Sequence, residues 1–243
     1  MRLSSAAFWG RLALTCLWLA PGCRSARAQV SPAEILNPQL QALESEHLQK
    51  LIALNHQISA AKFPFKFVPS RFVGVDPKDQ GALDKRGLEF VRFHERIVLK
   101  CSGNYNAAFN AKQLSRNQRA SQVFTDVVIP ILRMLPSHFA EEKERDFEAI
   151  GFEISYHVRE ASGRADYEGR ENLVVIFAAA DAFYFPRLTS VEDQQNVLNN
   201  SEIYLSGERY GLALGKVDPL SQEELLRPAQ AAQVGRTFSI GPR

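Results

Sequence analysis

The spacing of apolar residues predicts two helices. From Pro38 to Ala61, leucine and isoleucine recur at steps of three and four residues, which is typical of an amphipathic helix. Asn37 followed by proline marks its start. The same spacing from about Ser115 to Leu135 predicts a second helix, kinked where Pro130 removes a backbone donor and stopped by Pro136.

The first strand signals lie between the two helices. Leu88 to Cys101 is rich in β-branched and aromatic residues of one parity, which predicts one long strand or two strands with a kink near His94 and Glu95. The triplet Ser102-Gly103-Asn104 has the composition of a turn and is expected to end this strand.

The later strand signals are stronger. Phe152 to Val158 alternates apolar and polar residues, as expected for a strand with one face on the core and one in solvent. Ala161 to Arg170 is polar and predicts a turn. Leu173 to Phe185 is apolar at every position except Asp181, which predicts an interior strand covered on both sides.

The order of these elements favours an α+β fold. Strands and helices do not alternate strictly, so we expect a mixed or mainly antiparallel sheet with helices packed on one face, preceded by a long N-terminal helix. The expected divisions are a signal peptide at 1–28, a helical segment at 29–62, a single α+β domain at 63–215 and a flexible tail at 216–243.

The N-terminus has the composition of a secretory signal. Two arginines precede the apolar run from Leu12 to Ala20, and Ala26-Arg27-Ala28 presents small residues at the spacing used by signal peptidase. The run is shorter than the roughly 20 residues that span a bilayer. We therefore expect cleavage after Ala28, a secreted or periplasmic protein and no transmembrane segment in the mature chain. Lipoprotein processing at Cys23 is the less favoured alternative.

Removal of the signal changes the charge and the cysteine content. Four arginines and no acidic residue leave with it, so 29 basic against 27 acidic residues becomes 25 against 27, and the net charge changes from +2 to −2. Nucleic-acid binding, which requires a basic surface, is not expected. Cys101 is the one cysteine of the mature sequence, and we expect a buried, inert thiol.

Three residues are candidates for chemistry. Glu153 and His157 share the polar face of one predicted strand and could act together as acid and base. Asp181 is a carboxylate in an apolar run, where it is either a buried functional group or the cap of a turn at the end of the strand. Ordinary structural roles explain all three, so no catalytic, cofactor-binding or metal residue is assigned.

Sequence motifs add little. Val98 occupies the position where a zinc-protease motif beginning at His94 would need its second histidine, and no serine nucleophile elbow or phosphate-binding loop occurs. His47 falls within the stripe of the first helix and is interpreted as a stripe-edge histidine, because no second ligand type lies one turn away. Asn199 begins a glycosylation sequon, which matters only in a eukaryotic source.

We therefore expect an exported, non-catalytic binding or cell-envelope-associated module without a cofactor, and the sequence leaves open whether its partner is another protein or a second copy of the chain. One alternative is an extracytoplasmic hydrolase that uses Asp181, His157 or Glu153. Another is a homo-oligomeric structural protein that assembles through the helix at Pro38–Ala61, whose apolar stripe would suit a coiled coil.

Overall fold

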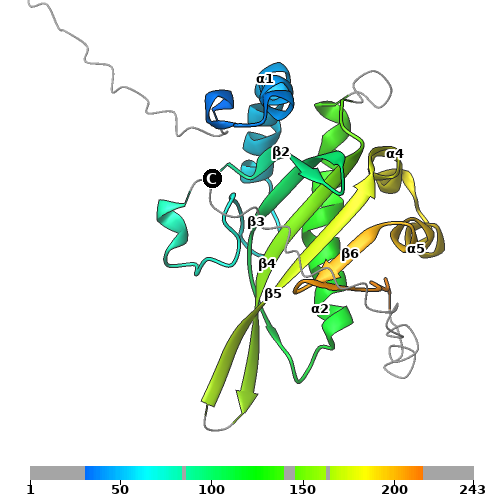
Figure 1. Ribbon diagram of the computed structural model, residues 1–243. Helices are drawn as coiled ribbons and strands as arrows, with labels where there is room; N and C mark the ends of the chain where they lie inside the picture. The colour runs from blue at the N-terminus through cyan, green and yellow to red at the C-terminus, as the bar shows by residue number, and fades with distance from the viewer. Residues whose placement is uncertain (1–30, 84–85, 140–145, 163–164, 216–243) are drawn as a thin grey trace, which may run out of the picture.

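The computed structural model describes residues 31–83, 86–139, 146–162 and 165–215 (Figure 1). The expected signal peptide, its cleavage site, Cys23 and the C-terminal tail lie outside these ranges. The helices are α1 (Pro38–Ala60), α2 (Arg116–Val123), α3 (Ile129–Met134), α4 (Ala179–Tyr184) and α5 (Val191–Asn199). The strands are β1 (Phe67–Pro69), β2 (Leu88–Phe93), β3 (Arg96–Asn110), β4 (Ala149–Ser162), β5 (Ala165–Ala178), β6 (Glu202–Leu205) and β7 (Glu208–Arg209).

Within the described ranges the strands form one seven-stranded sheet. Its order is β1-β3-β4-β5-β6-β7. The strand β2 pairs with the first part of β3, and β1 pairs with the residues of β3 that follow. The β3–β4 pair is parallel and the other pairs are antiparallel. The expected α+β class, the mainly antiparallel sheet and the helix that precedes it are confirmed.

The main core lies between the helices and one face of this sheet. Leu51 and Leu54 of α1 are fully buried there, and so are Phe124 and Ile131 from the segment of α2 and α3. Figure 1 shows the α2 segment behind the central strands. Because the apolar stripe of α1 is buried within its own chain, it is not available to a partner helix in the way that coiled-coil assembly requires.

The helix around Pro130 is confirmed, and its irregularity has a clear location. Ser115 caps α2 reciprocally with Gln118, and a π-helical turn at Phe124–Val128 joins α2 to α3. Pro130 is therefore one of the first residues after a widened turn. A π turn shifts the backbone hydrogen-bond register, which accommodates a residue without an N–H donor.

The structure places a turn, rather than a kink, between β2 and β3. His94 and Glu95 have φ values of 46° and 64°, the left-handed conformation of a two-residue hairpin turn. The expectation that Ser102-Gly103-Asn104 ends the strand is wrong, because β3 continues to Asn110. A Cβ on Gly103 would lie 2.5 Å from Cζ of Phe67, so this glycine permits the close approach of β1 rather than a turn.

The β4–β5 hairpin is longer than predicted. The paired strands Phe152–Val158 and Leu173–Phe177 are confirmed, but pairing continues outward to Ser162 opposite Ala165. The segment 161–170, predicted as a turn, is therefore mostly strand, and Figure 1 shows the hairpin extending beyond the rest of the sheet. Polar composition at the tip of a two-stranded ribbon is indistinguishable in sequence from a polar loop.

The apolar run that begins at Leu173 is strand only as far as Ala178. From Ala179 it becomes α4, in which Ala182 and Phe183 face the core, so the predicted strand to Phe185 is wrong in its second half. Asp181 lies in the first turn of α4, three residues after the N-cap position, which is occupied by Ala178. Its carboxylate is half-buried near a helix start, where negative charge is favourable.

Candidate functional site

The sheet face that points away from the core carries a line of buried charges. Lys100 of β3 lies between two carboxylates, with its Nζ 2.9 Å from Glu89 of β2 and 3.5 Å from Glu153 of β4. Arg71 approaches Glu89 at 3.4 Å, and Asn172 donates a 3.1 Å hydrogen bond to Glu153. Two positive and two negative side chains thus compensate one another, as charges removed from water must.

The polar face continues along β3 as a set of contacts to a loop. We call residues Ser70–Gln80 the anchored loop. Ser102 Oγ donates to the carbonyl oxygen of Ser70 at 2.9 Å. The Asn104 amide donates to the carbonyl oxygen of Phe72 at 2.8 Å and accepts from the N–H of Val75 at 3.0 Å. One strand side chain therefore fixes the loop backbone at two points.

The far end of the anchored loop is fixed as well. Gln80 and Asn106 exchange side-chain amide hydrogen bonds of 2.9 and 3.1 Å, and Gln80 also donates to the carbonyl oxygen of Val75. Arg170 of β5 donates to the carbonyl oxygen of Gly74 and to the Asp76 carboxylate. The hydrogen bond from Arg170 holds the pKa of Asp76 below its ordinary value, because it stabilises the ionised form.

The structure corrects the prediction that β4 has a solvent-exposed polar face. Glu153 is 4% exposed, and Ser155 and His157 are buried as well. The anchored loop passes over this region, since a Cβ built on Gly74 would lie 3.8 Å from Oγ of Ser155. A loop some 80 residues earlier in the chain covers the strand, and strand periodicity contains no information about that cover.

The three candidate residues do not converge. Glu153 and His157 are four residues apart along one strand, about 13 Å at the usual rise per residue. Asp181 lies beyond the end of the β4–β5 pair that is farther from His157, because β5 ends at Ala178, opposite Ala149. Groups at such separations cannot pass a proton directly, so the structure gives the predicted acid–base combination no common site.

Two buried tyrosines on the core side make charged hydrogen bonds. Tyr156 donates to Glu171 at 2.8 Å, and Arg119 pairs with the same carboxylate. Tyr105 donates to Asp126 at 2.9 Å. Burial, reinforced by the nearby carboxylates, raises the pKa of both tyrosines, so they remain neutral donors.

Exposed aromatic side chains lie at the β1 edge of the sheet. Phe72, in the anchored loop, is 58% exposed, and Phe65, just before β1, is 47% exposed. The Phe65 ring contacts the Tyr105 ring edge-on at 5.8 Å, and the Phe72 carbonyl is bound by the neighbouring strand residue Asn104. Both aromatics are therefore tied to the same part of β3, on a backbone that the sheet holds in place.

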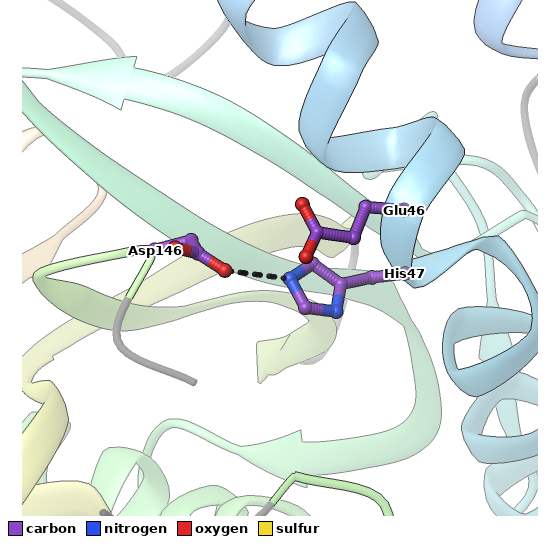
Figure 2. Close-up of side chains that lie close together, drawn as sticks. All are labelled: Glu46, His47 and Asp146. Carbon is purple, nitrogen blue, oxygen red and sulfur yellow. Dashed lines mark hydrogen bonds and ion pairs between the residues drawn. The ribbon is translucent and has the colours of Figure 1, made fainter. Parts of the chain in front are cut away.

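A separate cluster on α1 joins an imidazole to two carboxylates (Figure 2). His47 Nε2 lies 3.3 Å from Oδ2 of Asp146, and the carboxylate of Glu46 lies beside the imidazole. One ligand atom from each of the three side chains lies within 4.8 Å of the others. His47 lies in the buried stripe of α1, as the helical spacing predicts, but this spacing cannot reveal the grouping, because Asp146 is 99 residues away.

Comparison of the chain with protein-family models, curated proteins and solved structures found no match. Among the described residues, no helix combines the length and apolar character needed to cross a membrane.

Proposed function

We propose that this protein is an exported, non-catalytic binding module that contacts a protein partner through the anchored loop. The observation that carries the proposal is Phe72, an aromatic side chain 58% exposed on a loop whose backbone is bound by side chains of the two strands β3 and β5. Ordered loops on a rigid sheet are common recognition surfaces. A pre-ordered aromatic also loses little entropy on binding.

The polar face supports a structural role for its charged residues. Glu153 is engaged by Lys100 and Asn172, and Arg170 is engaged by the anchored loop. These side chains use their charges to hold strands and loop together. The alternative function, a hydrolase, requires Glu153, His157 and Asp181 in one cleft, and their separation gives that alternative no support.

Photo-crosslinking in the native host would test the proposal. A benzophenone amino acid at position 72 should give a covalent adduct with a specific protein, because Phe72 is expected to enter the interface. The same substitution at Tyr184, which is similarly exposed on α4, serves as the control. Adducts from both positions alike, or none from position 72, would contradict the proposal.

Export to the periplasm or the medium is supported by the arrangement of basic, apolar and small residues in the first 28 positions. Amino-terminal sequencing of the exported product should begin at Gln29. A product that retains Met1 would contradict cleavage, and one that begins at a lipid-modified Cys23 would support the lipoprotein alternative.

A further inference from the structure

We infer that Glu46, His47 and Asp146 form a binding site for one divalent transition-metal ion of the zinc type. The three side chains offer one imidazole nitrogen and two carboxylate oxygens, a ligand set that zinc accepts. This inference is independent of the proposed binding function, because the site lies on α1 and on the segment before β4 (Figure 2).

The geometry suits a metal ion. In a tetrahedral site with bonds of about 2.0 Å, neighbouring ligand atoms are about 3.3 Å apart. The observed separation between His47 Nε2 and Asp146 Oδ2 is 3.3 Å, and the Glu46 oxygen falls within the 4.8 Å limit of the group. Small rotations of the two carboxylates could bring all three ligands around one ion, with water in the fourth position.

His47 supplies the independent observation that points to a ligand. The residue is 2% exposed, and Phe90 and Phe139 pack on its ring at centroid distances of 5.6 and 5.8 Å. Within the part of the chain that the structure describes, its Nδ1 has no hydrogen-bond partner, and Nε2 is directed at Asp146. A buried imidazole is thus held in one orientation by aromatic rings, with Nε2 directed at the Asp146 carboxylate.

The exposed positions of the carboxylates give the ion a route to the site. The side chain of Asp146 is 46% exposed, and Glu46 is on the solvent side of α1. Two carboxylates and a neutral imidazole carry a formal charge of −2, which a divalent cation cancels. Among the described residues no acceptor binds a proton on Nδ1, so the affinity should be lower than in sites whose histidines have such an acceptor.

Zinc titration of the purified protein by calorimetry tests this assignment. The wild type should bind one Zn²⁺ per chain, and Glu46→Gln and Asp146→Asn should each weaken binding at least about tenfold. His47→Gln, which retains polarity and approximate size, should abolish binding. Glu192→Gln, which changes an exposed acid on α5, is the matched control and should bind like the wild type.

Cobalt substitution provides a readout of the ligands themselves. Co²⁺ bound at this site should show the visible d–d absorption bands of an ion in a low-symmetry ligand environment. These bands should change in Asp146→Asn, because one ligand is altered. The assignment would be overturned if the wild type bound no zinc. It would also be overturned if Glu46→Gln and Asp146→Asn, with circular dichroism spectra like the wild type, bound zinc as tightly as the control.

Discussion

The side-chain amide of Asn104 donates a 2.8 Å hydrogen bond to the carbonyl oxygen of Phe72, so a strand residue fixes the backbone beneath an exposed aromatic ring. The same amide accepts from Val75 on the other side of Gly74. The polar face of the sheet, which points away from the core, therefore supports the anchored loop. Its buried polar residues are explained by this role without an appeal to catalysis.

The buried charged residues of the polar face should contribute strongly to the stability of the fold. Lys100→Met keeps the length of the side chain but leaves Glu89 and Glu153 without their shared cation. We expect the free energy of unfolding to fall by about 3 kcal/mol, because a buried charge then lacks compensation. Lys62→Met, at an exposed position, should change it by less than about 0.5 kcal/mol. Equal urea midpoints for the two variants would contradict the buried network.

The approach of β1 to β3 depends on the missing side chain at Gly103. A methyl group there would lie 2.5 Å from the Phe67 ring and 2.7 Å from the Val68 carbonyl oxygen. Gly103→Ala should therefore lower the free energy of unfolding by about 1–3 kcal/mol through overpacking. Gly81→Ala is the matched control, since nothing lies within 4 Å of its added methyl group. If Gly103→Ala proved as stable as this control, the β1–β3 packing would be wrong.

Cys101 should make stability sensitive to alkaline pH. Burial raises the pKa of its thiol from the ordinary value of 9.0 to about 12. The unfolded thiol loses its proton above pH 9 while the folded thiol keeps it. Stability from this group is therefore complete below pH 9 and falls between pH 9 and 12, by at most about 1.4 kcal/mol per pH unit.

Urea unfolding of Cys101→Ala across this pH range measures the contribution. The substitution lowers stability at neutral pH through the lost sulfur, but its slope above pH 9 should be shallower than that of the wild type. Rapid reaction of the native wild-type thiol with a disulfide reagent at pH 8 would contradict its burial. After unfolding in guanidinium, the Cys101 thiol should react rapidly and completely with the same reagent.

Local patterns in the sequence were sufficient to predict the helices and strands whose apolar residues recur with a clear period. The helix at Pro38–Ala61 was predicted to within one residue, and the strands at Phe152–Val158 and from Leu173 onward were also predicted. In each case the apolar spacing reports directly on the face that is buried. The fold class followed from the order of these elements.

The sites could not be predicted because they depend on distant contacts. Ser102-Gly103-Asn104 has turn composition, but its members bind the anchored loop and admit the Phe67 ring. Polar residues on β4 were expected in solvent because nothing local indicates the loop that covers them. The grouping of His47 with Asp146 required the fold to bring together residues separated by 99 positions.

The most direct test of the anchored loop is amide hydrogen exchange at Val75, whose N–H donates to the Asn104 side chain at 3.0 Å. In the wild type this amide should exchange at least about 100-fold more slowly than an unstructured amide. In Asn104→Ala the protection at Val75 should be lost, while amides in the centre of α1 remain protected. Unprotected exchange at Val75 in the wild type would show that the sheet does not hold the loop, and would contradict the account.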